Sequence, residues 1–315
     1  MKKAIPALIV VCVAMLSLGR SLSAPAQDLP HTLNPTRDPQ PTPTVQARPA
    51  RQRLAQSTAT QTPYIILPVR SPTSAITSSP TLTPQITPSR RWLYHPPGEI
   101  AVPILLYHHV AQTDKPSRYY VSPEDFELQI SSLHDWGYTA IPLSLLVEAM
   151  LNGTELPLRP VVITFDDGYR DVYQNAVPIM QRYGYVGTLY IIVDQIGVGG
   201  YLNARQIAKL IEQGWELGSH SQTHAKLNKP GTSLEKEVAS SREVLETLFS
   251  TPVRSFSYPY GSTTPAITQL VKESGYRSAV GLGALNTHRV KYLYYLSRNE
   301  VQGTFDLVTF ASLLR

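Results

Sequence analysis

Apolar runs alternate with amphipathic stretches along the second part of the chain, from about residue 98 to the end. Short runs rich in β-branched residues are typical of buried strands, whereas apolar residues at every third or fourth position are typical of helices. Several helical stretches end in Gly, which suits the left-handed conformation at a helix end, and a new apolar run follows directly. The predicted strands lie in VPILLY (102–107), YTAIPL (138–143), VVITF (161–165), GTLYII (187–192), WELGS (215–219), RSFS (254–257) and RSAVGL (277–282).

This alternation predicts an α/β fold with a parallel sheet of about seven strands. So many units in a domain of this size fit a closed or nearly closed β/α barrel better than a small open sheet with long insertions. The carboxyl ends of all strands in such a barrel face one rim. Polar residues at the strand ends are therefore expected to converge.

The stretch VVITFDDGY (161–169) places two carboxylates at the end of a buried strand. Asp-Gly is common in hairpin turns, but a hairpin requires a second strand directly afterwards. The residues that follow have apolar positions at helical spacing instead, so the pattern is strand, loop and helix. Because successive side chains of a strand point to opposite faces, Asp166 and Asp167 can share a site only where the strand ends. Gly168 allows that break.

The first 26 residues combine two Lys, a long apolar run and a small-residue cleavage site, Ala24-Pro25-Ala26. These features are typical of a secretory signal peptide or an amino-terminal anchor, so the chain is expected outside the cell or at the cell envelope. Cys12 is the one Cys of the chain. Disulfides are therefore not expected in the mature protein. Residues 27–97 are rich in Pro, Ser, Thr and Gln without apolar periodicity, which predicts a disordered linker.

Charge is distributed unevenly between the two parts of the chain. Residues 1–97 carry a net charge of +8 and residues 98–315 carry −3, so the high isoelectric point belongs to the amino-terminal part. A basic linker is suited to contact an anionic envelope surface, although a simply solvated linker explains the charge equally well. The negative domain disfavours nucleic acid as a partner, and a monomer is expected.

Polar residues follow several of the predicted strands. They are His108 and His109 after the first strand, Asp166 and Asp167 after VVITF, His220 and His224 after WELGS, and Tyr258, Pro259 and Tyr260 after RSFS. Two His with one carboxylate form a frequent ligand set of catalytic zinc, which keeps a further position open for water. A metal bound to one carboxylate of an Asp-Asp pair relieves the repulsion between them and leaves the other as a proton acceptor.

Each of these motifs has a simpler explanation when it is taken alone. The two His four residues apart fit two surface histidines, Asp-Asp-Gly fits a turn, and Pro259 between two Tyr fits a rigid turn. A non-haem iron oxygenase also uses two His and one carboxylate, but it differs in residue order and fold. The convergence of all motifs on one predicted rim is what favours a metal site.

The sequence resembles the polysaccharide deacetylases, the NodB-homology domain of carbohydrate esterase family 4. TFDDGY matches the first motif of that family, SHSQTH matches the second, and FSYPYG occupies the place of the third. The resemblance spans about residues 100–300. It implies a distorted (β/α)7 barrel, a divalent metal, and hydrolysis of N-acetyl groups on a polymer of amino sugars.

The resemblance also assigns roles to residues. It implies Asp167, His220 and His224 as ligands of a metal, Zn²⁺ foremost and otherwise Co²⁺, Ni²⁺ or Mn²⁺. Asp166 is then the general base, and the Tyr260 backbone N–H, beside Tyr258 and Pro259, stabilises the oxyanion.

Two departures from the family pattern point to one branch of it. The carboxyl-terminal stretch has no Leu-x-His motif for the general acid, and Ser257 stands where many members have Arg. Together with ILLYHHV at the first strand, these departures resemble the enzymes that deacetylate poly-N-acetylglucosamine. On that resemblance His108 is the general acid, with His109 as a weaker candidate, and Arg298 supports the base.

Three functions are therefore weighed for the domain 98–315. The first is an exported N-deacetylase of an N-acetylglucosamine glycan such as poly-N-acetylglucosamine, peptidoglycan or a chitin-like polymer. The second is an O-acetyl esterase acting on a xylan-type polymer with the same metal and base. The third is a glycan-binding wall protein with a vestigial site, which the retention of all four metal-site residues disfavours.

Overall fold

The structure is a computed structural model that describes residues 91–115 and 117–315. The chain divides into two units, Met1–Ser79 and Pro80–Arg315, and all described residues belong to the second. The predicted signal or anchor segment and most of the predicted linker lie outside the described residues. Within the described part, no helix combines the length and the apolar character needed to cross a membrane.

A parallel sheet forms the centre of the domain, as the strand pattern predicts. Its order is β12-β11-β10-β9-β8-β3-β14, and the short strand β6 pairs with the start of β8. The strands are β3 (Ile104–Tyr107), β6 (Thr139–Ala140), β8 (Pro160–Phe165), β9 (Thr188–Ile191), β10 (Glu216–Ser219), β11 (Ser255–Ser257), β12 (Ser278–Val280) and β14 (Asn299–Glu300). All seven predicted strands are present, and the expected fold class is confirmed.

The last strand brings the two edges of the sheet together. β14 pairs with β3 on one side. On the other side, the residues just before β14 bond to the residues that follow β12, since the Gly281 N–H donates to the Leu296 carbonyl and the Gly283 N–H donates to the Arg298 carbonyl. The apolar pattern missed β14, because it has only two residues, both polar. Its pairing is decided by residues almost two hundred positions earlier in the chain.

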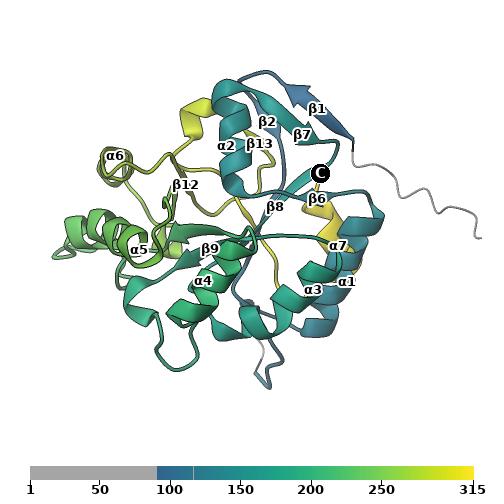
Figure 1. Ribbon diagram of the computed structural model, residues 1–315, viewed down its shortest axis with the longest axis horizontal. Coiled ribbons are helices and arrows are strands. Elements are labelled where there is room, and N and C mark those ends of the chain that lie inside the picture. The colour runs from purple at the N-terminus through teal and green to yellow at the C-terminus, as the bar shows by residue number, and fades with distance from the viewer. Residues whose placement is uncertain (1–90, 116) are drawn as a thin grey trace, which may run out of the picture. The chain divides into compact units, whose positions relative to one another are not determined.

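Helices cover the outside of the curved sheet (Figure 1). The helical segments of the described residues are α1 (Pro123–Asp135), α2 (Leu143–Asn152), η1 (Val172–Ala176), α3 (Val177–Arg182), η2 (Val193–Gln195), α4 (Ala204–Glu212), η3 (Glu235–Ser240), α5 (Ser241–Phe249), η4 (Pro259–Gly261), α6 (Pro265–Glu273), η5 (Val290–Tyr292) and α7 (Leu307–Ser312). The helix predicted after VVITF is present, and its first turn, η1, has the wider π geometry. Gly137 and Gly214, which end α1 and α4, have φ of 78° and 89°, as expected for glycines that turn a helix into a strand.

The strands read as continuous apolar runs because both of their faces are buried. Alternate residues belong to different core clusters: Ile163 of β8 packs with the surrounding helices, whereas Val162 packs with Ile104 and helix α2. Further along the inward face, the buried residues after Val162 are Thr164 and then Asp166. The interior of the barrel therefore changes from apolar to polar toward the carboxyl ends of the strands.

Three small sheets complete the fold. β4 (His109–Val110) pairs with β5 (Tyr120–Val121), β2 (Ile100–Ala101) pairs with β13 (Thr287–His288), and β1 (Trp92–His95) pairs with β7 (Thr154–Pro157). β1 lies within the stretch that composition assigned to the disordered linker. The folded part thus begins a few residues earlier than predicted, because β7 supplies backbone partners that composition cannot reveal.

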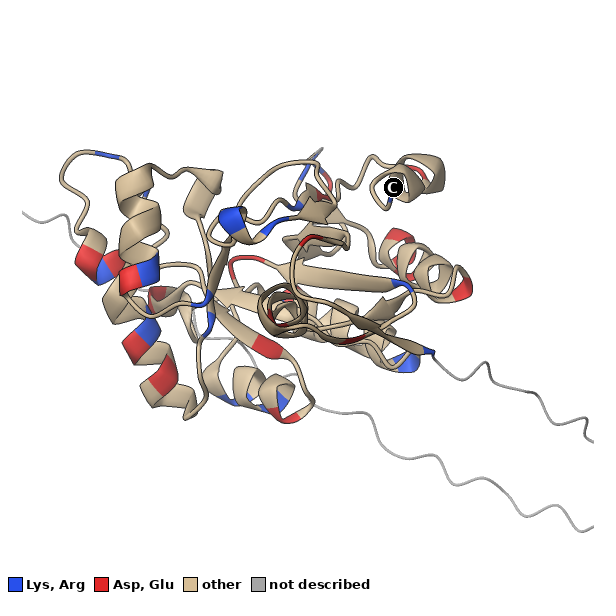
Figure 2. Cartoon of the chain, turned by 90° about the horizontal axis from the view of Figure 1, so that it is seen from above, with Lys and Arg blue, Asp and Glu red and all other residues tan. Residues whose placement is uncertain are grey.

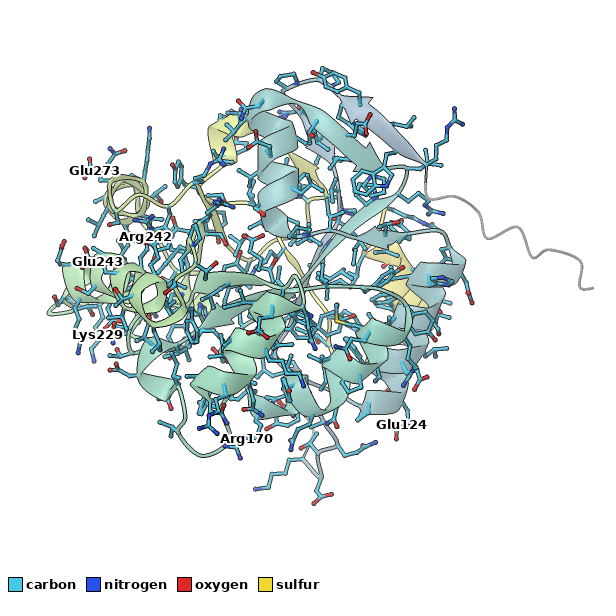
Figure 3. The ribbon with its side chains drawn as sticks, in the orientation of Figure 1. Glu124, Arg170, Lys229, Arg242, Glu243 and Glu273 are labelled. Carbon is cyan, nitrogen blue, oxygen red and sulfur yellow. The ribbon has the colours of Figure 1, made fainter. Side chains whose placement is uncertain are left out.

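Charged side chains are spread over the helices and loops, with both signs intermixed (Figure 2). Glu124, Arg170, Lys229, Glu243 and Glu273 lie at the periphery of the domain (Figure 3). Four charged residues of the described part are less than a tenth exposed, namely Glu237 and, at the ends of the central strands, Asp166, Asp167 and Arg298. Such burial is costly unless the charges are paired, so their partners indicate what they do.

Candidate active site

A cavity of about 500 Å³ opens at the carboxyl ends of the strands. It brings together most of the residues that the sequence motifs single out, namely His108, His109, Asp166, Asp167, His220, His224, Tyr258, Tyr260 and Arg298. Pro259 is buried in η4 and is not one of the residues that line the cavity. The convergence expected for a barrel rim therefore occurs.

The two adjacent carboxylates reach the cavity because the chain leaves the strand conformation between them. β8 ends at Phe165, and Asp167 and Gly168 have φ of 70° and 81°. A Cβ atom at position 168 would lie 2.8 Å from the Ile191 side chain, so Gly is required there on two counts. The break that the sequence assigned to Gly168 begins one residue earlier, at Asp167.

Asp167, His220 and His224 form a cluster in which each residue offers one ligand atom. Asp167 Oδ1 lies 3.4 Å from His220 Nε2 and 3.4 Å from His224 Nε2. Ligands about 2.1 Å from a tetrahedral zinc ion lie roughly 3.4 Å apart, so these two distances fit a metal site, and the three ligand atoms all lie within 4.8 Å of one another. Asp167 Oδ1 is also buried without a hydrogen-bond partner. A cation would satisfy that oxygen, and the three residues therefore fit a divalent metal.

Backbone contacts orient the two histidines. His220 Nδ1 bonds to the Ser257 carbonyl at 2.8 Å, which leaves Nε2 for the cluster. The backbone of His224 is fixed by a hydrogen bond in which its N–H donates to Ser221 Oγ. A ring nitrogen fixed on a carbonyl is the usual support of a metal-bound His.

The two rings also differ in their affinity for protons. Burial lowers the pKa of His220, but the nearby carboxylates outweigh burial and raise it overall. Burial and the neighbouring His220 lower the pKa of His224 to about 4. His224 is therefore ready to act as a neutral ligand at neutral pH.

Asp166 is held by a buried arginine from the other end of the domain. Arg298 Nη1 and Nη2 donate to Asp166 Oδ1 and Oδ2, each at 2.7 Å, and Ser257 Oγ donates to Oδ2 at 3.0 Å. Burial alone would raise the pKa of Asp166, but the charges of Arg298 and His220 outweigh it and hold that pKa well below its usual range. Asp166 is thus an ionised acceptor with a fixed orientation.

His108 stands at the end of β3 on the wall of the cavity. Its ring meets that of Tyr119 edge-on, with 4.8 Å between the ring centroids. Burial lowers the pKa of His108, while Asp166 and Asp167 act in the opposite direction without cancelling the effect. The ring is close enough to both carboxylates to interact with their charges.

His109 is enclosed in a stack of aromatic rings. Its ring lies 4.0 Å from that of Tyr120 and 3.6 Å from that of Tyr169, both nearly parallel, and its Nδ1 bonds to Asp171 Oδ2 at 2.6 Å. The second oxygen of Asp171 accepts the N–H of Val110. The structure thus ties His109 into the cavity wall, whereas His108 beside it is not part of this stack.

Asp171 and Asn175 were not singled out by the sequence motifs, yet together they bind the chain next to His108. Asp171 accepts the Val110 N–H at 3.0 Å, and Asn175 Nδ2 donates to the Val110 carbonyl at 2.7 Å. Both residues lie at the start of the helix that follows the Asp-Asp pair. Ser257 was noted only as a departure from the family, although it contacts both Asp166 and His220.

The two tyrosines of YPYG play different parts. Tyr258 is buried and its hydroxyl donates to the Tyr294 carbonyl, so it supports the turn. Tyr260 is 61% exposed, has φ of 60°, and its ring centroid lies 4.6 Å from that of His224. Tyr260 therefore forms part of the open edge of the metal cluster.

Backbone strain is concentrated at this site. Among the described residues, five other than Gly have positive φ, and four of them are Asp167, Ser221, His224 and Tyr260. Such conformations cost about 1 to 3 kcal/mol each and persist where surrounding contacts enforce them. Their grouping around one cluster is typical of a functional site.

Known proteins share sequence and fold with this chain. The family model described as polysaccharide deacetylase matches residues 154–279. YxkH of Bacillus subtilis (strain 168), whose name places it with the polysaccharide deacetylases, is 30% identical over 203 residues, which is 64% of this chain and 71% of YxkH. The chain belongs to the polysaccharide deacetylase family. The family resemblance seen in the sequence motifs is confirmed.

Other deacetylases are also similar to this chain. The poly-beta-1,6-N-acetyl-D-glucosamine N-deacetylase of Staphylococcus aureus (strain MRSA252) is 27% identical over 179 residues, covering 52% of this chain and 61% of that protein. The crystal structure of BC0361, a polysaccharide deacetylase from Bacillus cereus, superposes with a TM-score of 0.62 at 27% identity, covering 69% of this chain and 70% of that chain.

Proposed function

We propose that this polysaccharide deacetylase is a metal-dependent N-deacetylase of a polymer containing N-acetylglucosamine. The observation that carries the proposal is the unsatisfied Asp167 Oδ1 between His220 and His224, directly beside an ionised Asp166 held by Arg298. The domain thus combines a three-residue metal site with a separate, oriented proton acceptor in one cavity. That combination suits metal-assisted hydrolysis of an amide.

Asp167, His220 and His224 are the residues that would hold the metal, for which we propose Zn²⁺. When bound there, the metal would acidify a water molecule and polarise the acetyl carbonyl. Asp166, the oriented carboxylate beside the cluster, would act as the general base. The bidentate contact with Arg298 keeps the Asp166 carboxylate ionised and fixes its orientation.

His108 supplies the proton that the leaving amine needs. It lies on the cavity wall and interacts with both carboxylates, so it can receive a proton released at Asp166 and pass it to the departing nitrogen. His109 is the weaker candidate because its Nδ1 is bonded to Asp171 and both faces of its ring are covered by tyrosines. The Tyr260 N–H stabilises the tetrahedral oxyanion, and one such donor is typically worth about 3 kcal/mol.

The proposed substrate class follows the relatives. The similar Staphylococcus aureus protein is named for action on poly-beta-1,6-N-acetyl-D-glucosamine, and ILLYHHV together with Ser257 suits the same branch. We extend the proposal to an exported enzyme at the cell envelope, since residues 1–26 have the composition of a signal or anchor. The basic linker would then lie along the anionic envelope.

Acetate release is the direct test. Purified protein is incubated with β-1,6-linked N-acetylglucosamine oligomers in the presence of Zn²⁺ or a chelator, beside Asp166→Asn and His108→Ala. Release that requires metal and is lost in both variants supports the proposal with its base and acid. Loss in Asp166→Asn alone would remove His108 from the mechanism.

Two further substrates separate the remaining alternatives. Release from acetylated xylan and not from the N-acetylated oligomers would favour the O-acetyl esterase. Metal binding without release from any of these glycans or from peptidoglycan would favour a glycan-binding protein.

A further inference from the structure

A second cavity adjoins the catalytic one. Its volume is about 310 Å³, and it is lined by the segment that runs out from β12 and returns to β14, residues 282–297, which we call the outer segment. Leu282 lines both cavities, so it forms the boundary between them. Leu282 also packs against the turn that holds Tyr260, because a Cβ atom at Gly261 would lie 2.6 Å from its side chain.

The wall of the second cavity is built from fixed contacts. β13 pairs the outer segment with β2, and His288 Nε2 donates to the Val102 carbonyl at 2.9 Å. The Leu285 N–H donates to Ser297 Oγ, which joins the outgoing and returning strands of the segment. Tyr295 reaches the catalytic side, where its hydroxyl donates to the Gly261 carbonyl and its ring stacks on Tyr258. The second cavity is therefore preformed, and it extends from the catalytic rim at Leu282 toward the start of β3.

Large apolar side chains that line the second cavity are exposed to solvent. Leu285 is 68% exposed and Tyr292 is 55% exposed, and both line the cavity. Thr287 and Ser297 add hydroxyl groups, and the Lys291 amino group lies 4.7 Å from the centroid of the Tyr292 ring. An apolar surface with a few polar groups at its edge is the usual composition of a small-ligand site, and the volume falls within the range of about 300–1,000 Å³ found for such sites.

We propose that this second cavity binds a further sugar residue of the same N-acetylglucosamine chain whose acetyl group is cleaved at the metal cluster. The inference rests on the proposed function and extends it. A sugar ring has a C–H face that packs on an aromatic ring such as Tyr292, while its hydroxyl rim remains available to Ser297 and Thr287. The glycan passes from the catalytic cavity over Leu282 to the outer segment.

Continuity with the catalytic cavity is the reason for choosing a glycan as the occupant. A cavity of about 500 Å³ encloses only a short part of a polymer, so the chain must leave it along the surface. A glycan that crosses Leu282 enters the second cavity, which is preformed and largely apolar. The second cavity thus adjoins the catalytic one at Leu282, on one path by which the glycan can leave it.

The test is the dependence of the rate on oligomer length. We expect kcat/KM of the unchanged protein to rise from the N-acetylglucosamine dimer to the hexamer, because the longer chain reaches the second cavity. Tyr292→Ala is expected to lower kcat/KM on the hexamer three- to tenfold, about the size of one lost aromatic contact, and to leave the dimer unaffected. Tyr292→Phe, which keeps the ring, should behave like the unchanged protein. Tyr94→Ala is the matched control, since Tyr94 is 64% exposed and lines neither cavity.

Equal losses on dimer and hexamer, or no loss on either, would overturn the inference. Hexamer binding to Asp166→Asn, with and without Tyr292→Ala, is measured by calorimetry so that binding can be judged apart from catalysis. If the protein releases no acetate but the hexamer binds more weakly after Tyr292→Ala, the proposed function fails, while the inference that the second cavity binds the glycan is supported. If hexamer binding is the same with and without Tyr292→Ala, the inference fails whatever the activity.

Discussion

Arg298 and Asp166 form a bidentate pair in the interior of the domain, with both nitrogen–oxygen distances at 2.7 Å. The two residues are 132 positions apart in the chain, and each is almost fully buried. Two buried charges compensate each other only while both are present. This pair therefore links the orientation of the proposed base to the closure of the barrel at β14.

Removal of Arg298 is expected to destabilise the fold strongly. Arg298→Met leaves a buried carboxylate without its counter-charge, which typically costs about 3 to 5 kcal/mol in the free energy of unfolding. Urea denaturation in the presence of a chelator measures this cost without a contribution from metal binding.

Arg277→Met is the matched control for Arg298→Met. Arg277 pairs with Glu148 at 3.0 Å on the surface, and an exposed pair is worth about 1 kcal/mol or less. The double variant Arg298→Met with Asp166→Asn should recover part of the loss. A loss for Arg298→Met no larger than that for Arg277→Met would show that the pair is not important for stability.

Metal affinity should depend on the three clustered residues. His220→Ala and Asp167→Asn each remove one proposed ligand, and we expect Zn²⁺ affinity to fall on the order of a hundredfold or more, because changes to the supporting residues alone cost 10- to 100-fold. Isothermal titration calorimetry with Zn²⁺ measures the change. His134→Ala, which alters an exposed histidine outside the cluster, should bind Zn²⁺ normally. Unchanged affinity in both ligand variants would place the metal elsewhere.

Asp171 should affect the rate through the position of His108. Asp171→Ala releases both the His109 ring and the Val110 N–H, which belong to the two residues that follow His108, the proposed acid. We expect kcat to fall on the order of ten- to a hundredfold with little change in KM, as for other small displacements of a catalytic group. Asp171→Asn should be milder, since an amide oxygen can still accept the Val110 N–H. Asp135→Ala on the surface is the control, and a change in thermal stability without a change in kcat would limit Asp171 to a structural role.

The stability of the domain should decrease at mildly acidic pH in part because of His288. Burial lowers the pKa of His288 in the folded protein, and the Val102 carbonyl offsets this only in part. The unfolded chain therefore takes up a proton at a higher pH than the folded one. The contribution of His288 is fully present above the unfolded pKa of about 6.5 and is lost as pH falls through the folded value.

His288→Gln should reduce this acid sensitivity, because a glutamine amide has no charged form and can still donate to the Val102 carbonyl. Melting temperatures between pH 7.5 and 5 measure the effect, with His134→Gln as an exposed control. The decrease on acidification is expected to be smaller in His288→Gln than in the unchanged protein or the control. Equal decreases in all three would mean that His288 does not contribute.

The sequence by itself determined the strand pattern, the barrel class and the clustering of the motif residues. Local periodicity suffices for strands such as VVITF because both of their faces are buried. The rule that parallel strands end at one rim then brings Asp167, His220 and His224 together without further information. Family resemblance added roles that spacing alone could not assign.

Only the tertiary structure decided which residues support that site. The closing strand β14 and the hydrogen bonds of Asp171 and Asn175 to Val110 join residues that are distant in the chain, whereas the family resemblance had already indicated Arg298 as the partner of Asp166. The start of the folded part at β1 also depends on a distant partner, β7. Such contacts leave no periodic signal, because a hydrogen bond or ion pair is set by where the chain returns and not by the residues beside it.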